Sequence, residues 1–200
     1  MRIGIYGGTF NPIHIAHMQI ADAAARALSL DRVLFIPAAN PYMKNRSELV
    51  SYQHRKNMVA IAANNDARFE VRDDDVSGNA PTYTSITVEN IRAEYPEAEL
   101  FLILGEDSFI QLDKWHDTET IFKNIAGIYV YRRNDTSLTN GQLVTLYPGI
   151  QVIASMPSEN LDISSTIIRY RLRHKFACKY LMPNGVYDYI ENNKLYNMEA

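Results

Sequence analysis

The sequence lacks the features that would assign it to several specialised classes of protein. Cys178 is the single cysteine among 200 residues, which excludes an internal disulfide and a zinc site built from several cysteines. Every apolar run is far shorter than the ~20 residues that a membrane-spanning helix needs. The N-terminus shows no apolar segment typical of a secretory signal, because Gly7-Gly8-Thr9 interrupts the first short run. We therefore expect a cytoplasmic protein that does not enter a membrane.

The chain also lacks an excess of basic residues. It carries 20 Lys and Arg against 23 Asp and Glu, a formal net charge of −3, so no nucleic-acid partner is expected. The glycine-lysine signature of P-loop enzymes and the G-x-G-x-x-G signature of dinucleotide-binding loops are missing from the sequence. So is the G-x-S-x-G signature of the α/β-hydrolases. A phosphate group would have to be bound by other means.

What the chain does contain is a regular alternation of short apolar segments and helical segments. Several apolar segments are continuous, as expected of strands buried on both faces. This alternation predicts an α/β fold: a Rossmann-like, doubly wound, mostly parallel sheet of five to six strands with flanking helices. The segments expected to form strands are Arg2–Tyr6, Arg32–Pro37, Phe69–Val71, Leu100–Leu104, Gly127–Tyr131 and Ile150–Ala154.

Helices are predicted between these strands and near the C-terminus, from alanine content and from apolar residues three and four apart. Residues 1–200 are expected to form a single domain, with a C-terminal helical segment of about residues 160–200 packed on it. Two polar stretches, 134–140 and 156–160, are expected to be linkers. The expected helices are Ile15–Leu28, Ser51–Asn64, Thr84–Tyr95, Ser164–Arg173 and Val186–Asn192.

The polar segment after the first strand is the strongest candidate for chemistry, because ligands of such sheets bind at the carboxyl ends of strands. Gly7 and Gly8 let the backbone approach a ligand. The helix that follows offers free amides to phosphate. His14 and His17 share one face of its first turn. The alternative is that one histidine caps the helix and the other packs in the core.

Three further segments carry candidate residues, each with a structural alternative. Lys44 follows the second strand and could reach an anionic ligand, or be a solvated lysine. Gly105 and Asp107 follow the fourth strand, where the carboxylate could accept from ribose hydroxyls, and Trp115 could stack on an aromatic ring or pack in the core. Ser165 and Arg169 could hold an anion at a helix start, or the serine could be an ordinary cap.

Two separated segments resemble the signatures of the nucleotidyltransferase superfamily. GGTFNPIHIAH, which ends at His17, resembles the first signature, and ISSTIIR, which ends at Arg169, resembles the second. Within the superfamily the chain is similar to bacterial nicotinate-nucleotide adenylyltransferases over essentially its whole length. The supporting segments are Thr82-Tyr83-Thr84, Gly105-Glu106-Asp107-Ser108 with Trp115, and LMPNGVYDYI ending at Ile190.

The resemblance implies an enzyme of NAD biosynthesis that joins nicotinate mononucleotide and ATP, releasing pyrophosphate, with Mg²⁺ accompanying ATP. The two nucleotides are its expected partners, no metal-ligating residues are assigned, and a homo-oligomer is left open. Catalytic roles are implied for His14, His17, Lys44 and Arg169. ATP contacts are implied for Gly7, Gly8, Thr9, Phe10, His14, His17, Gly105, Asp107, Arg133, Ile163, Ser164, Ser165 and Arg169. Mononucleotide contacts are implied for Gly8, Thr9, Lys44, Thr82, Tyr83, Thr84, Asp107, Trp115 and His116.

The sequence departs from the family pattern at several positions. Asn11 stands for the usual Asp, Ala16 for Gly between the histidines, and Met43 for a frequent His. We expect these changes to alter ATP affinity without abolishing turnover. Two alternatives stay open: another phosphorylated acceptor such as phosphopantetheine, and a nucleotide sensor without turnover.

Overall fold

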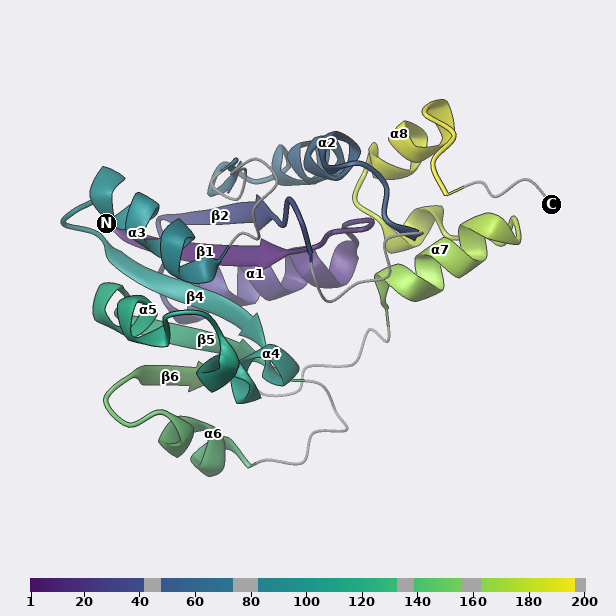
Figure 1. Ribbon diagram of the computed structural model, residues 1–200. Helices are drawn as coiled ribbons and strands as arrows, with labels where there is room; N and C mark the ends of the chain where they lie inside the picture. The colour runs from purple at the N-terminus through teal and green to yellow at the C-terminus, as the bar shows by residue number, and fades with distance from the viewer. Residues whose placement is uncertain (42–47, 74–82, 133–138, 156–162, 197–200) are drawn as a thin grey trace.

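The computed structural model describes residues 1–41, 48–73, 83–132, 139–155 and 163–196. Its centre is one parallel sheet of six strands in the order β3-β2-β1-β4-β5-β6 (Figure 1). Strand order reverses beside β1, which neighbours β2 on one side and β4 on the other. This is the predicted doubly wound sheet, with all strand pairs parallel. The strands are β1 Arg2–Gly8, β2 Arg32–Pro37, β3 Phe69–Val71, β4 Glu99–Gly105, β5 Gly127–Tyr131 and β6 Gln151–Ala154.

The five predicted helices are confirmed, with ends that differ by one residue at most. Three short α-helices and two 3-10 helices were not predicted, because one or two turns give little apolar periodicity. One of them starts at Asn140, so the stretch 134–140 is not a linker throughout; its residues 134–138, like the stretch 156–160, lie outside the described residues. The helices are α1 Ile15–Ala27, α2 Tyr52–Ala63, α3 Thr84–Glu94, α4 Glu106–Ile110, η2 Leu112–Lys114, α5 Thr118–Asn124, α6 Asn140–Leu146, α7 Ser165–Arg173, η3 Lys179–Leu181 and α8 Val186–Asn192.

Each face of the sheet has its own buried core, because alternate strand residues point to opposite faces. On β2, Val33 and Phe35 join the core beneath α1 and α2, whereas Leu34 and Ile36 join the core beneath α3. Burial on both faces explains why the strand sequences are continuously apolar. No helix among the described residues is long and apolar enough to cross a membrane.

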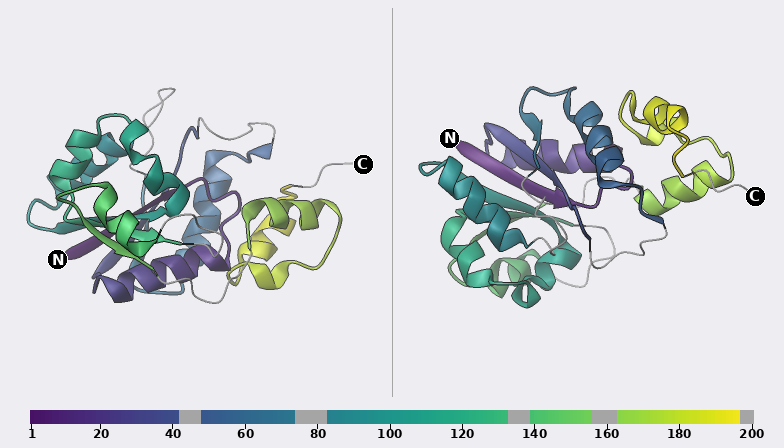
Figure 2. Two further views of the ribbon diagram at one scale, coloured as in Figure 1. Left: turned by 90° about the horizontal axis from the view of Figure 1, so that it is seen from below. Right: turned by 45° about the horizontal axis from the view of Figure 1, so that its top comes forward.

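The C-terminal helices α7 and α8 lie together beyond the carboxyl ends of the strands (Figures 1 and 2). Ile168 of α7 and Val186 of α8 are fully buried and belong to the same core as Phe35 of β2. This shared core supports a single domain, which stays a prediction. It also places the ISSTIIR segment at the edge of the sheet where ligands of this fold bind.

Candidate active site

A cavity of about 420 Å³ lies at the carboxyl ends of β1, β2 and β4. Its position beside β1 is where the strand order reverses, the expected ligand site of a doubly wound sheet. Four parts of the chain that are distant in sequence supply its walls. The polar or aromatic lining residues and the glycines among them are Tyr6, Gly7, Gly8, Thr9, Tyr83, Thr84, Thr87, Gly105, Asp107, Ser108, Gln111, Trp115 and His116.

The two glycines that end β1 serve different purposes. A Cβ atom on Gly7 would meet no atom within 4 Å, so this position borders open space in the cavity. A Cβ on Gly8 would lie 2.7 Å from Cζ of Phe10. The Phe10 ring is buried against Tyr6 and Phe35, with centroids 5.6 and 5.8 Å away. Gly8 is therefore required by the packing of Phe10, whereas Gly7 leaves room for a ligand.

One side of the cavity is aromatic. Trp115 is half-buried, packs against the core beneath α3, and lines the cavity. The rings of Tyr83 and His116 stack with centroids 4.1 Å apart and planes inclined by 17°, and Ser85 Oγ lies 3.4 Å from His116 Nδ1. Flat aromatic surfaces in a cavity favour a planar aromatic ligand.

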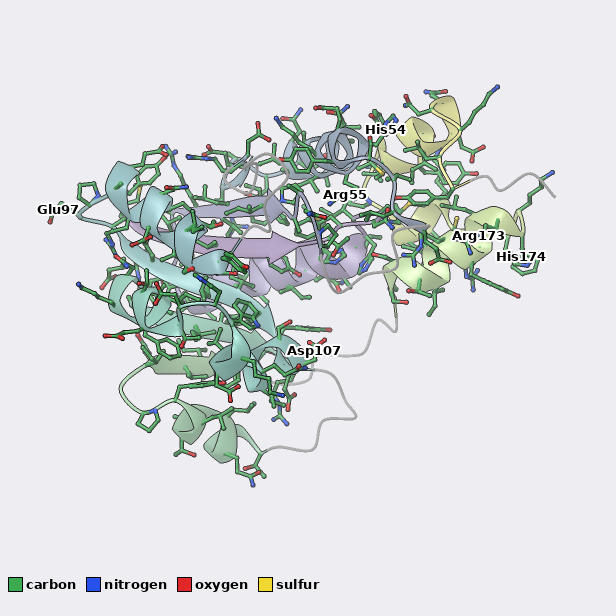
Figure 3. The ribbon with its side chains drawn as sticks, in the orientation of Figure 1. His54, Arg55, Glu97, Asp107, Arg173 and His174 are labelled. Atoms are coloured by element: carbon green, nitrogen blue, oxygen red, sulfur yellow. The ribbon has the colours of Figure 1, made fainter. Side chains whose placement is uncertain are left out.

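The lining of the cavity also includes a carboxylate. Asp107 is exposed in the first turn of α4, at the carboxyl end of β4 (Figure 3). A Cβ on Gly105 would lie 2.6 Å from Asp107 Oδ1, so the glycine leaves the carboxylate its place. An exposed carboxylate beside a cavity can accept hydrogen bonds from ligand hydroxyls.

The two histidines form a separate cluster that does not line the cavity. His14 is buried at the N-cap of α1, and its ring lies over that of His17 at a centroid distance of 3.7 Å. The backbone N–H of His14 donates to Nδ1 of His17 at 3.1 Å. Because Nδ1 accepts this bond, the neutral His17 ring carries its proton on Nε2, which is therefore a donor. His17 thus takes part in the cap of α1, as the structural alternative expected of one of the two histidines.

The start of α7 contacts the loop that precedes α1. Ser164 caps α7 by accepting from the Ile167 N–H at 3.2 Å. Ser165 Oγ donates to the carbonyl of Pro12 at 2.9 Å, and Arg169 Nη1 donates to the carbonyl of Asn11 at 3.0 Å. The structure therefore brings the two signature segments into direct contact.

Arg169 also belongs to a cluster of charges. Its Nη2 donates to Glu48 at 2.8 Å, and Nη2 of Arg173 donates to the other carboxylate oxygen at 2.9 Å. These two guanidinium groups, Arg169 first, hold the pKa of Glu48 below its ordinary value. Two guanidinium groups side by side can bind an oxyanion, and here they bind the carboxylate of Glu48.

Asn11 explains one departure from the family pattern. Its Nδ2 donates to the carbonyl of Glu48 at 2.9 Å, and its Oδ1 accepts from the hydroxyl of Tyr196 at 2.8 Å and from the Val50 N–H. An aspartate could not donate to the Glu48 carbonyl. Burial raises the pKa of the Tyr196 phenol, which stays a hydrogen-bond donor.

The candidate residues thus divide between two neighbouring places. Nine line the cavity: Gly7, Gly8, Thr9, Tyr83, Thr84, Gly105, Asp107, Trp115 and His116. Seven others lie around the start of α1 and of α7: Phe10, His14, His17, Ile163, Ser164, Ser165 and Arg169. Lys44, Met43, Thr82 and Arg133 lie outside the described residues.

Sequence reasoning missed several residues of this region. Thr87, Ser108 and Gln111 line the cavity, and Glu48 and Arg173 pair beside Arg169. Helical periodicity could have identified Thr87, because it lies one turn after Tyr83. Nothing in the sequence pattern indicates Glu48, whose partners lie more than 100 residues away.

A metal ion would find few protein ligands here. The described parts of the chain contain no group of three His, Cys, Asp or Glu residues that could hold one. Mg²⁺ prefers to keep waters and to bind substrate phosphates together with one or two carboxylates. The donor set therefore fits an ion that arrives with a nucleotide.

Comparison with known proteins identifies the family. The family described as cytidylyltransferase-like matches residues 5–171. A probable nicotinate-nucleotide adenylyltransferase of Corynebacterium kroppenstedtii is 37% identical over 98% of this chain and 90% of its own length. The chain belongs to this family. A relative of the same description from Carboxydothermus hydrogenoformans is 36% identical, over 98% of both chains.

Solved structures agree with the fold. The nicotinic acid mononucleotide adenylyltransferase of Plasmodium falciparum, in complex with NaAD, superposes with a TM-score of 0.81. The match covers 98% of this chain and 97% of that one, at 22% identity. The same protein in complex with APC gives a TM-score of 0.79. At this identity the likeness concerns the arrangement of the sheet and its helices.

Proposed function

We propose that this member of the family transfers the adenylyl group of ATP to nicotinate mononucleotide, giving nicotinate adenine dinucleotide and pyrophosphate in NAD biosynthesis. The observation that carries the proposal is the pairing of two unlike sites at one edge of the sheet. The cavity offers an aromatic wall and a carboxylate, while the neighbouring cluster of α1 and α7 offers histidine and arginine donors. Such a pair fits one substrate with a planar ring and another with a triphosphate.

The cavity is the proposed mononucleotide site. The pyridine ring would stack on Trp115, and the ribose hydroxyls would donate to Asp107. The ring carboxylate would lie near Thr84 and the backbone amide of His116, both at the cavity wall. Thr82, Tyr83, Gly8 and Thr9 complete the proposed set. A donor-rich wall favours the acid over the amide.

The histidine and arginine cluster is the proposed triphosphate site. His14 and His17 would donate to phosphate oxygens, with Nε2–H of His17 as the donor that the helix cap leaves on that ring. Ser165 and Arg169 would hold the β- and γ-phosphates. Arg169 is able to bind an oxyanion, because it donates to the carboxylate of Glu48. Lys44 and Arg133 are proposed to contact phosphate and adenosine.

The chemistry needs no enzyme nucleophile. An oxygen of the mononucleotide 5′-phosphate attacks the α-phosphorus of ATP, and the bond to the pyrophosphate oxygen breaks in line with it. Pyrophosphate leaves with that electron pair. The protein's contribution is to hold the reacting groups in line and to stabilise developing charge with fixed donors. Mg²⁺, bound to phosphate oxygens and water, would neutralise part of that charge.

The test is pyrophosphate release from ATP and Mg²⁺ with three acceptors: nicotinate mononucleotide, nicotinamide mononucleotide and phosphopantetheine. We expect release with the nicotinate form, strongly preferred over the amide. Release with phosphopantetheine alone would overturn the acceptor assignment. If no pyrophosphate is released with any of the three acceptors while ATP still binds, the protein is a nucleotide sensor and the proposed activity is overturned.

Two further expectations stay predictions. We propose that the protein acts in the cytoplasm, where both nucleotide substrates are available to it. The number of copies in the active particle is left open, and sedimentation at enzyme concentrations used for assay would determine it.

A further inference from the structure

Arg55 is a charged residue in a place where only apolar residues are expected. It lies on α2 in the same stripe as Met58, Val59 and Ala62, and like them it is 0% exposed. Figure 3 shows it between α2 and the carboxyl ends of the neighbouring strands. A buried cation is costly unless hydrogen bonds compensate for the lost water. The hydrogen bonds of the Arg55 guanidinium must therefore compensate for the cost of burying its charge.

Those contacts are backbone carbonyl oxygens from three separate segments. Nη1 of Arg55 donates to the carbonyl of Thr9 at 2.9 Å, which follows β1. Nη2 donates to the carbonyl of Ala39 at 3.4 Å, which follows β2. Nε donates to the carbonyl of Val50 at 3.2 Å, just before α2. One planar group thus holds two strand-end loops and the segment that enters α2.

Two of these segments form walls of the cavity. Thr9 itself lines it, and Ala39 lies between the lining residues Ala38 and Pro41. Arg55 does not line the cavity, so it acts on a ligand only through the loops.

The direction of the carbonyl groups matters for an anionic ligand. A carbonyl oxygen that faces a guanidinium is turned away from a phosphate, which it would otherwise repel. In a trans peptide the next N–H points the opposite way. Holding the carbonyls of Thr9 and Ala39 therefore also sets the direction of the N–H groups of Phe10 and Asn40. A single buried cation fixes the orientation of peptide groups in both loops.

We propose that Arg55 is a positioning residue for the mononucleotide site, orienting the loops after β1 and β2 so that the phosphate of the mononucleotide is held in line. The expected effect on kcat/KM rests on the proposed function. The expected effect on the order of the two loops rests on their hydrogen bonds to Arg55 alone. Arginine is required because its rigid fork serves three acceptors at once, which a lysine ammonium on a flexible stem does not.

The molecule supplies a matched control at the other end of the sheet. Arg92 of α3 also donates to several backbone carbonyls, two of which are Ala98 at 2.7 Å and Asn124 at 2.6 Å. These groups lie where β4 begins and where α5 ends, away from the cavity. Arg92→Lys removes the same kind of fork without touching a cavity loop.

The kinetic experiment compares Arg55→Lys with Arg92→Lys and the unaltered protein. A displacement of about 1 Å at the reacting groups can cost 10²-fold. We expect kcat/KM for the mononucleotide to fall by roughly 10- to 100-fold in Arg55→Lys, and to stay near the unaltered value in Arg92→Lys. Equal kcat/KM in all three, or an equal loss in both variants, would overturn the proposal.

The structural experiment does not depend on turnover. Amide hydrogen exchange of the free protein is measured at residues 7–10 and 38–40. We expect faster exchange in these loops for Arg55→Lys and unchanged exchange there for Arg92→Lys. Unchanged loop exchange in Arg55→Lys overturns the proposal even if activity is lost. Loop loosening in a protein that releases no pyrophosphate would instead support the positioning role while removing the proposed function.

A second variant keeps the test decisive if Arg55→Lys does not fold. Arg55→Gln removes the charge but keeps two N–H donors on a shorter stem. The same exchange and kinetic comparison applies to it, with Arg92→Gln as its partner. The expected and overturning outcomes are unchanged.

Discussion

The two ends of the sheet use arginine in the same way but for different purposes. At the amino ends of the strands, the guanidinium of Arg92 donates to the carbonyls of Pro96 and Ala98, in the connection that leads into β4. At the carboxyl ends, Arg55 and Arg169 also donate to backbone carbonyls, but these belong to loops around the cavity and the histidine cluster.

The difference teaches that the effect of losing an arginine hydrogen bond depends on the role of the backbone carbonyl that accepts it. A carbonyl in a closed turn needs only to be satisfied, so losing its donor lowers stability. A carbonyl in a ligand-binding loop also sets a direction, so losing its donor changes the geometry of binding. Changes at the amino ends should therefore alter the free energy of unfolding, and changes at the carboxyl ends should alter kinetics.

The largest expected effect is at His17. Removing a preorganised donor to the transition state costs ~10²–10³ in rate, so we expect His17→Ala to lower kcat by about that factor with a modest change in KM. His17→Asn separates the two roles of the ring, because its amide oxygen can still accept from the His14 N–H. We expect Asn to preserve the melting temperature but not kcat, and full kcat in His17→Ala would remove the assigned role.

Trp115 tests the aromatic wall of the cavity. Stacking on an aromatic side chain contributes ~1–3 kcal/mol per base, so Trp115→Ala should raise KM for the mononucleotide by roughly 5- to 150-fold. Trp115→Phe keeps an aromatic face and should restore much of the affinity. Steady-state kinetics with each substrate varied in turn measures both. An unchanged KM for the mononucleotide would move the pyridine ring elsewhere.

Arg92 tests the amino ends. Arg92→Met leaves several backbone carbonyls without their charged donor, and we expect a loss of ~1–3 kcal/mol in the free energy of unfolding. The KM values should not change. Chemical denaturation together with kinetics provides the measurement, and a KM change at constant stability would break the proposed division between the two ends.

The smallest effect is expected at an ion pair that does not line the cavity, between Arg72 and Glu94. Arg72 Nη2 contacts Glu94 at 2.5 Å and is the main cause of a pKa of about 2 for that carboxyl. Because the folded pKa lies below the unfolded one, the stabilisation is present above the ordinary pKa and is lost as the pH falls toward 2.

Half of the Glu94 side chain is exposed, so salt screens the pair and its contribution stays below ~1 kcal/mol. Glu94→Gln should lower the melting temperature slightly at neutral pH and low salt. The difference from the unaltered protein should vanish at high salt and at low pH. A large difference that persists in high salt would contradict this.

Much of the fold could be predicted from the sequence, because strands that are buried on both faces have continuously apolar sequences. The short helices α4 and α5 could not, since neither is long enough to show a period. The candidate site was predictable where a residue follows a strand directly, as Asp107 does. It was not predictable for Arg55 and Asn11, because their side chains donate to backbone carbonyls, which carry no residue-specific signal in the sequence. A charged residue in the apolar stripe of α2 was the one available signal for Arg55.

The hydrogen bond between Tyr196 and Asn11 joins residues 185 positions apart. On the ribosome, the loop that carries Asn11 emerges early and must wait until the whole of α7 and α8 has followed before this contact can form. The loop that carries Asn11 is therefore completed only after nearly the whole described chain has been synthesised. Because Val186 and Ile190 of α8 also belong to the core that contains Phe35, a chain cut short within α8 would lack this contact and part of that core together.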